Sequence, residues 1–337
     1  MISHHIRGIP QPVSQLCLGT SEFGSSIDVA TANALMDRFA HCGGNFIDTA
    51  HVYGAWDPHG INHGNGNSEV VIGRWLKERG NREHIILGTK GGHPHFQTRA
   101  SGLTPNRLLQ QINESLQRLQ TDFIDIYWLH RDDRSIPVSE ILGWLEAPFK
   151  QGSIRTLGFS NWRIDRIAEA IAYTQQHEYP IIVIASQIAS SLAQSLPSRK
   201  ALFYGEELAM DTETSEFHRH TQFPLVAYSP QAEGFFAEKY DHSNFNLPNF
   251  PKPNLISKYG SKLNLQRRAL ALRMAQSKGC STNQIALAWL LRQAFPSFAI
   301  IGPRSLEQLD NSISGTLIEL NDNEYLQLQE PPQLESY

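Results

Sequence analysis

Eight short apolar runs, each separated from the next by a segment with helical spacing, constrain the fold of this chain most strongly. The runs are apolar throughout rather than alternating, which is typical of strands buried on both faces of a parallel sheet. Eight alternations of strand and helix favour a closed, eight-stranded parallel (β/α)8 TIM barrel over an open doubly wound sheet. The runs lie at 15–19, 45–47, 84–89, 123–129, 154–159, 181–186, 224–228 and 299–301.

The segments between the runs read as amphipathic helices, most clearly at 105–119, 138–150 and 163–176. In the first of them, Thr104 is a plausible N-cap directly before a proline at the first helical position. The chain of 337 residues suits one barrel of about 250 residues with inserted loops, and it has no short repeat or low-complexity linker. We therefore expect a single domain over residues 1–337.

Long loops follow several of the predicted strands, at 54–67, 187–211 and 231–262. They leave the carboxyl ends of the strands, where barrel enzymes build their active sites. We expect these loops to wall a pocket at the C-terminal face.

Charge and cysteine content exclude several classes of protein. The net charge is −4 with a pI near 6.4, so there is no basic excess to neutralise a nucleic acid. The three cysteines (Cys17, Cys42 and Cys280) match no disulfide framework or zinc spacing. No apolar stretch resembles a signal peptide or the roughly 20-residue span of a membrane helix, so we expect a cytoplasmic protein without a membrane partner. The oligomeric state is not readable from the sequence.

Four polar residues stand close behind three of the predicted strands: Asp48, Tyr53, Lys90 and His130. Parallel barrel strands place their carboxyl ends at one mouth, so a carboxylate, a phenol, an ammonium and an imidazole would meet there. An ammonium beside a phenol favours the phenolate and lowers a pKa that is otherwise about 10. Such a group suits carbonyl reduction, with Tyr53 protonating the oxygen and a neutral His130 polarising it, an acid effect typically worth ~10²–10⁴-fold.

Six segments in order resemble the aldo-keto reductase family, over about residues 15–312. They are Asn-Phe-Ile-Asp-Thr-Ala-His-Val-Tyr-Gly at 45–54, Leu-Gly-Thr-Lys-Gly-Gly at 87–92, the run 115–130 that ends in Leu-His, Gly-Ser-Ile-Arg-Thr-Leu-Gly-Phe-Ser-Asn at 152–161, Ala-Tyr-Ser-Pro at 227–230 and Ile-Ile-Gly-Pro-Arg-Ser-Leu-Glu-Gln at 300–308. The resemblance implies a (β/α)8 barrel, hydride transfer from NADPH, and a catalytic tetrad formed by the four residues named above.

The resemblance also implies a set of cofactor contacts. Ser160, Asn161 and Gln187 would contact the nicotinamide carboxamide, and Tyr228 would stack on the nicotinamide ring. The remaining expected contacts are Gly19, Thr20, Ser229, Pro230, Gly302, Arg304, Ser305, Gln308 and Asn311. The sequence 308–312, Gln-Leu-Asp-Asn-Ser, departs from the family pattern Gln-Leu-x-Glu-Asn, which puts adenosine contacts in question.

The residues after the last predicted strand indicate a preference for NADPH over NADH. No G-x-G-x-x-G follows a strand, so a Rossmann half is not indicated. Instead, residues 302–305 follow the last strand and open a helix, whose N-terminal amides favour a phosphate. Arg304 can bind the 2′-phosphate of NADPH through two parallel hydrogen bonds.

The substrate is expected to be a small-molecule carbonyl or the matching alcohol, such as a sugar, an aromatic aldehyde or an aliphatic aldehyde. Trp56, His93 and Phe235 are the candidate pocket residues.

Two other functions compete with carbonyl reduction. A redox-sensing regulatory subunit could keep the tetrad and bind the nucleotide while turning over slowly. A metal-dependent barrel hydrolase could use Asp48 with the histidines at the mouth, although no metal is expected because Lys90 and Tyr53 would then have no role. Those histidines are His51, His59, His63, His93, His95 and His130.

Overall fold

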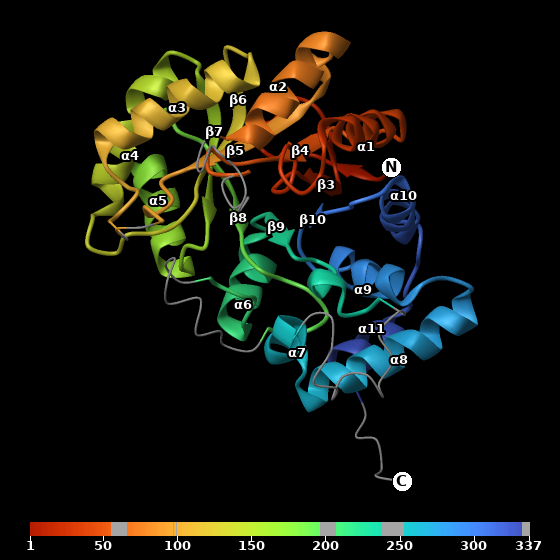
Figure 1. Cartoon of the computed structure of the whole chain (residues 1–337). Coiled ribbons are helices and arrows are strands. Elements are labelled where there is room, and N and C mark those ends of the chain that lie inside the picture. The colour runs from red at the N-terminus through yellow and green to blue at the C-terminus, as the bar shows by residue number, and fades with distance from the viewer. Residues whose placement is uncertain (55–65, 97, 99, 196–206, 238–252, 332–337) are drawn as a thin grey trace.

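Eight parallel strands close into a barrel in the order β10-β3-β4-β5-β6-β7-β8-β9, as the computed structural model in Figure 1 shows. The structure describes residues 1–54, 66–96, 98, 100–195, 207–237 and 253–331. The predicted TIM barrel is thereby confirmed. The barrel strands are β3 Leu16–Gly19, β4 Phe46–Asp48, β5 Ile86–Gly91, β6 Ile124–Leu129, β7 Ile154–Ser160, β8 Val183–Gln187, β9 Leu225–Tyr228 and β10 Ser297–Ile301.

One helix of the barrel ring follows each strand. These helices are α1 Val29–His41, α2 Asn67–Arg79, α3 Pro105–Leu119, α4 Val138–Lys150, α5 Ile164–Gln176, α6 Thr212–Thr221, α9 Thr282–Leu291 and α10 Leu306–Gly315. The helices predicted at 105–119 and 138–150 begin and end at the expected residues. Thr104 is the N-cap of α3, but its side chain makes no capping hydrogen bond.

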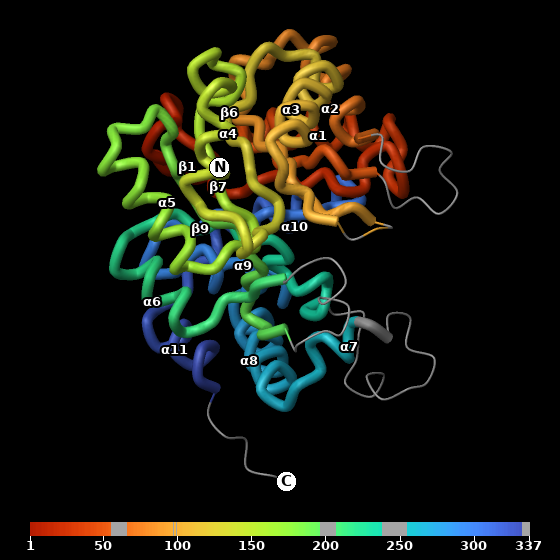
Figure 2. Tube along the Cα trace, turned by 90° about the vertical axis from the view of Figure 1, so that its left-hand side faces the viewer, coloured from red at the N-terminus to blue at the C-terminus, as the bar shows by residue number. Residues whose placement is uncertain are grey.

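Elements outside the barrel alternation were not predicted from the sequence. An antiparallel pair, β1 Ser3–His4 and β2 Val13–Ser14, precedes the barrel. Three helices are additional: α7 Pro253–Tyr259, α8 Lys262–Lys278 and α11 Asp322–Gln329. Figures 1 and 2 show them grouped on the side of the barrel away from α2 and α3. Among the described residues, 3-10 turns lie at Arg82–His84 and Ala232–Gly234.

The barrel interior is filled by side chains from alternate strand positions, because successive residues of a strand point to opposite faces. Phe46, Ile86, Ile126, Val226 and Phe298 belong to one buried cluster inside the barrel. Ile6, Ile9 and Val13 of the N-terminal segment join the same cluster. The segment before β3 therefore packs against the amino-terminal end of the barrel, and the opposite end is left for the site.

Trp128 occupies the layer directly below the mouth, and two glycines make room for it. A Cβ added at Gly158 would lie 2.3 Å from the Trp128 ring, and one added at Gly88 would lie 2.8 Å from its Nε1. These two strand glycines are therefore required by the close approach of a large ring.

In the three predicted long loops, at 54–67, 187–211 and 231–262, residues 55–65, 196–206 and 238–252 lie outside the described residues. The third predicted loop contains the helix α7 Pro253–Tyr259. Within the described part of the chain, no helix is both long enough and apolar enough to cross a membrane.

Candidate active site

The four predicted catalytic residues lie together at the carboxyl ends of β4, β5 and β6. Asp48 ends β4, Lys90 is the fifth residue of β5, and His130 directly follows β6. The Lys90 Nζ donates to Asp48 Oδ2 and, at 2.7 Å, to the carbonyl of Thr49. It also lies 4.8 Å from the centre of the Tyr53 ring. The Tyr53 and His130 rings meet edge to face with their centroids 6.0 Å apart.

The turn after β4 is held so that Tyr53 faces this group. The amide of His51 donates to the Lys90 carbonyl at 3.0 Å, and the His51 carbonyl accepts from Arg118 at 3.2 Å. Gly54 has φ +87°, and a Cβ there would lie 2.8 Å from the Asn67 Cβ. The residue after the tyrosine must therefore be a glycine, which lets the turn pass closely over the start of α2.

Behind this turn lies an ionic network that sequence reasoning missed. Arg118 pairs with the fully buried Glu69 at 3.2 Å and with Glu114 at 3.4 Å. Glu69 also accepts from Thr89 at 2.6 Å, and Glu114 contacts His51 Nε2 at 2.6 Å. The signal was available in the helical spacing of Glu114 and Arg118, but that spacing alone does not show what the pair contacts.

Lys90 and Asp48 form a buried ion pair whose side chains are only 1% and 2% exposed. Burial lowers the pKa of the Lys90 ammonium, but Asp48 and Tyr53 together raise it by more, so the net direction is upward. Burial raises the pKa of Asp48, and the ion pair with Lys90 opposes that rise. Lys90 is thus held as a cation beneath the tyrosine ring.

The tyrosine behaves differently from the sequence expectation. Burial raises the pKa of Tyr53, and the nearby Lys90 ammonium lowers it as expected, but the net direction is upward. Desolvation disfavours the phenolate more than one ammonium favours it, since that ammonium is already neutralised by Asp48. Tyr53 is therefore a protonated phenol at neutral pH, which is the form a general acid requires.

His130 is neutral at the mouth, in line with the expectation from sequence. Burial lowers its pKa far below 6.5, and the charges of Arg131 and Lys90 lower it further. Its Nδ1 is buried without a hydrogen-bond partner among the described residues. A neutral imidazole can donate one hydrogen bond to a carbonyl oxygen without carrying a charge.

Residues expected at the nicotinamide form one polar cluster at the ends of β7 and β8. Gln187 donates to Asp48 Oδ1 at 3.0 Å and accepts from the Ser160 hydroxyl at 3.4 Å. Asn161, in a left-handed conformation with φ 58°, donates to the Ser160 hydroxyl at 3.0 Å and accepts from the Tyr228 hydroxyl at 2.8 Å. The cluster therefore connects Asp48 to the partly buried ring of Tyr228.

Gly19 and Thr20 support the site from β3. A Cβ at Gly19 would lie 2.7 Å from the Ile300 side chain, so this position is closely packed. Thr20 is fully buried, and its hydroxyl donates to the Asp48 carbonyl at 2.9 Å. Two strands away, just after β9, Ser229 adopts φ 52° and Pro230 is buried.

The loop after β10 opens α10, as the sequence predicts. Ser305 is the N-cap, and its hydroxyl accepts from the Gln308 amide at 3.3 Å. The amide of Arg304, two residues after Gly302, donates to the Gln308 side chain at 2.8 Å. Arg304 itself pairs with Glu22 at 2.5 Å, a partner that sequence reasoning missed. Asn311 faces the other way, with its side chain bonded to Ser281 at the N-cap of α9.

These surroundings fit a nicotinamide dinucleotide. Amide and hydroxyl groups surround Asp48, the aromatic ring of Tyr228 is only partly buried, and an arginine stands at a capped helix N-terminus where a phosphate is favoured. The residues that would hold the group are those of the polar cluster and of the loop 302–308.

The predicted substrate-pocket residues divide into three cases. His93 lies against His130 with ring centroids 4.9 Å apart, so it borders the tetrad. Phe235 is fully buried in a second core cluster with Phe236, Tyr259 and Leu270, which is the position of a core side chain rather than of the mouth. Trp56 lies outside the described residues.

Arg131 is a further residue at the mouth that sequence reasoning missed. It is only 8% exposed, donates to the His130 carbonyl at 3.0 Å and lies 3.6 Å from Glu207. Its position next to His130 was a usable signal. Glu207 is 76 positions from Arg131 in the sequence, and nothing in the pattern connects the two.

The histidine cluster does not assemble within the described residues. His51 contacts Glu114, and His95 accepts from the Thr98 amide at 3.2 Å. No group of three or more potential metal ligands occurs in the described part of the chain, and His59 and His63 lie outside it.

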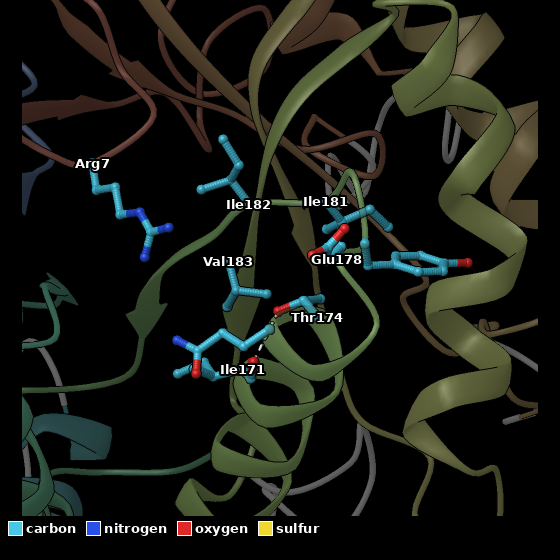
Figure 3. A pocket seen from close by; sticks show the side chains of 9 residues that line it. Arg7, Ile171, Thr174, Glu178, Ile181, Ile182 and Val183 are labelled. Carbon is cyan, nitrogen blue, oxygen red and sulfur yellow. Dashed lines mark hydrogen bonds between the residues drawn. The ribbon is translucent and has the colours of Figure 1, made fainter.

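A separate cavity lies at the opposite end of the barrel from the tetrad. Its walls come from Arg7, the carboxyl end of α5, the turn at Glu178 and the amino end of β8, as Figure 3 shows. Val183 begins β8 whereas Gln187 ends it, so this cavity is a strand length away from the chemistry.

Known proteins resemble the chain along nearly its whole length. The model of the aldo/keto reductase family matches residues 15–331. The uncharacterized oxidoreductase YrpG of Bacillus subtilis is 30% identical over 94% of this chain and 91% of its own. Norsolorinic acid reductase stcV of Emericella nidulans is 27% identical over 94% of this chain and 78% of its own. Protein tas of Escherichia coli is 27% identical over 99% of this chain and 98% of its own.

The solved structure of the thermostable aldo-keto reductase Tm1743 has the same fold. It has a TM-score of 0.70, 24% identity, and covers 98% of this chain and 99% of its own. The tetrad geometry and the match over residues 15–331 agree, and the chain belongs to the aldo/keto reductase family of NAD(P)H-dependent carbonyl reductases.

Proposed function

We propose that this protein is an NADPH-dependent reductase that reversibly transfers hydride to an aldehyde or ketone, with Tyr53 as the general acid. The observation that carries the proposal is the buried Lys90–Asp48 pair beneath the Tyr53 ring, with neutral His130 on the other side of the phenol. A bound nicotinamide supplies the hydride. The residues described below supply everything else the carbonyl needs.

The proton moves from the Tyr53 hydroxyl to the carbonyl oxygen as that oxygen becomes an alkoxide. A raised pKa suits this step, because Tyr53 keeps its proton until a stronger base develops beside it. Lys90 stabilises the resulting phenolate, since its ammonium is held in place by Asp48 and by the Thr49 carbonyl. His130 donates a hydrogen bond to the same oxygen in its neutral form.

The substrate class is a small aldehyde or ketone. His93 and Phe96 stand in contact next to His130, with ring centroids 4.8 Å apart, and offer aromatic surface beside the reacting oxygen. Aromatic faces together with polar groups suit a sugar or another small polar carbonyl. Sugars are therefore the first compounds to test, followed by aromatic and aliphatic aldehydes.

The test is reduction of this panel by purified protein with NADPH, measured as loss of reduced cofactor, with and without a metal chelator. Chelator-resistant turnover supports the proposal, whereas chelator-sensitive hydrolysis without NADPH oxidation would overturn it. Slow turnover on every member despite tight NADPH binding would favour a regulatory subunit instead. Arg304→Ala should weaken NADPH binding far more than NADH binding, and equal losses would remove the 2′-phosphate role.

A further inference from the structure

We infer that Glu22 is a cofactor-selectivity residue that opposes the 2′-phosphate at Arg304 and so narrows the preference of the protein for NADPH over NADH. The inference rests on the proposed role of Arg304 in dinucleotide binding. Its starting observation is direct: both carboxylate oxygens of Glu22 lie against the same guanidinium nitrogen of Arg304, at 2.6 and 2.5 Å.

The barrel topology brings these two residues together. β10 pairs in parallel with β3, with Ile301 opposite Leu18. The loops that leave the two strands therefore emerge side by side at the mouth, although the residues are 282 positions apart in the sequence. Glu22 lies in the first of these loops and Arg304 in the second.

Glu22 is fixed in place by its own turn. Its carbonyl accepts from the amides of Ser25 at 3.2 Å and Ile27 at 3.0 Å. Its carboxylate accepts from the Ser26 hydroxyl at 2.6 Å. The side chain is about a third exposed, whereas that of Arg304 is 60% exposed. Arg304 is thus the more mobile partner, and the carboxylate stays near any group that the arginine binds.

The charge of the Glu22 carboxylate affects the affinities for NADPH and NADH differently. A ribose 2′-phosphate carries about −1.5 to −2 charges at neutral pH, the value for a phosphate monoester, and would share one guanidinium with the Glu22 carboxylate. The 2′-hydroxyl of NADH carries no charge and can donate a hydrogen bond to a carboxylate, the contact that acidic residues make with NAD in other folds. Arg304 favours the 2′-phosphate and Glu22 disfavours it. The pair therefore weakens the discrimination between NADPH and NADH.

The test compares NADPH and NADH affinities by fluorescence titration in the wild-type protein, Glu22→Gln and Glu319→Gln. The first variant removes the carboxylate charge but keeps an acceptor for Ser26. The second removes the same charge from an exposed position beyond the end of α10, outside the loop that would hold the cofactor, and is the matched control.

The expected result is an NADPH Kd about two- to fivefold tighter in Glu22→Gln, the size typical of an exposed charge pair, with NADH changed by less than about twofold. The gain should shrink at high salt, because exposed charges are screened. An unchanged NADPH-to-NADH ratio, or an equal change in Glu319→Gln, would overturn the inference. Wild-type protein that binds neither dinucleotide would instead overturn the proposed function.

Discussion

Separating the two charges of the buried ion pair should cost more than removing both together. The variants are Asp48→Asn, Lys90→Met and the double replacement. Each single change leaves one buried partner without its counter-charge, in a site where the side chains are 1% and 2% exposed. Leaving one buried charge of a pair uncompensated typically costs about 3–5 kcal/mol of unfolding free energy, whereas removing both can be nearly neutral.

The remaining contacts refine this expectation. In Lys90→Met, the Asp48 carboxylate keeps only the Gln187 donor at 3.0 Å. In Asp48→Asn, the ammonium keeps the Thr49 carbonyl at 2.7 Å and its hydrogen bond with Tyr53, but burial then lowers the Lys90 pKa without opposition from a carboxylate. The double variant loses the charges together, so its cost should fall below the sum of the single costs by about 2 kcal/mol or more.

The wild-type protein, the two single variants and the double variant are unfolded in urea at pH 7, and unfolding is monitored by tryptophan fluorescence. The four unfolding free energies form a double-mutant cycle, and turnover is measured on the same samples. We expect turnover to be lost in all three variants. The double variant recovers stability, but it still lacks the Lys90 cation beneath the Tyr53 ring. Additive costs in the double variant would refute the view that Asp48 and Lys90 act as a coupled pair.

Three further predictions concern other parts of the structure. Gly158→Ala should destabilise the barrel by about 1–3 kcal/mol in urea unfolding, because its Cβ would lie 2.3 Å from the Trp128 ring. Arg118→Met should lower kcat by about 10- to 100-fold with little change in NADPH affinity, because it releases the His51 carbonyl and shifts the turn carrying Tyr53. Stability should fall as pH drops below about 6.5, at up to about 1.4 kcal/mol per pH unit from His218, because burial lowers its pKa in the folded state and the unfolded chain takes the proton first.

Each of these has a control and a contrary outcome. Gly143→Ala, at an exposed position of α4, should be neutral or stabilising, and equal losses at both glycines would contradict the packing argument. Arg74→Met, on the exposed face of α2, should leave kcat unchanged. If Arg118→Met lowers stability but not kcat, Arg118 does not position Tyr53. His218→Gln should make the acid limb of the stability curve less steep, leaving the part that comes from the buried His130, while the exposed His220→Gln should not change it. The reverse pattern would exclude His218 as a source.

The barrel and the tetrad could be predicted because both rest on short-range patterns. Strands buried on both faces are apolar throughout, and each ends where a polar residue such as Asp48 or His130 begins the mouth. The helix α3 was predictable from its apolar spacing and from Pro105 at its start. Parallel pairing then brings the strand ends together, whatever the loops do.

Helix α8 was not predictable in this way, because its buried face mixes polar and apolar residues. Arg267 and Arg268 are about 95% buried and donate to backbone carbonyls of Leu328 and Phe235. These arginines interrupt the apolar stripe that Leu270, Ala271 and Met274 contribute to the second core cluster. The contacts of Glu22 and Glu207 could not be predicted either. Their partners, Arg304 and Arg131, are remote in sequence and come close only through the barrel topology.

The pKa of Tyr53 shows a second limit of sequence reasoning. A neighbouring lysine predicted a lower pKa, and the folded environment gives a higher one, because the sequence does not show how much solvent the mouth excludes. The role of the tyrosine as a protonated acid at neutral pH does not change, but the direction of its pKa shift does.

The most direct test of the tetrad is a single-turnover measurement on Tyr53→Phe, with NADPH bound in advance and a saturating aldehyde added. Phenylalanine keeps the ring beside His130 and removes only the proton donor. We expect an NADPH Kd within about twofold of the wild-type value and a hydride-transfer rate lower by ~10²–10⁴-fold, the range for loss of a general acid. A hydride-transfer rate equal to that of the wild type would contradict the assignment of Tyr53 as the acid.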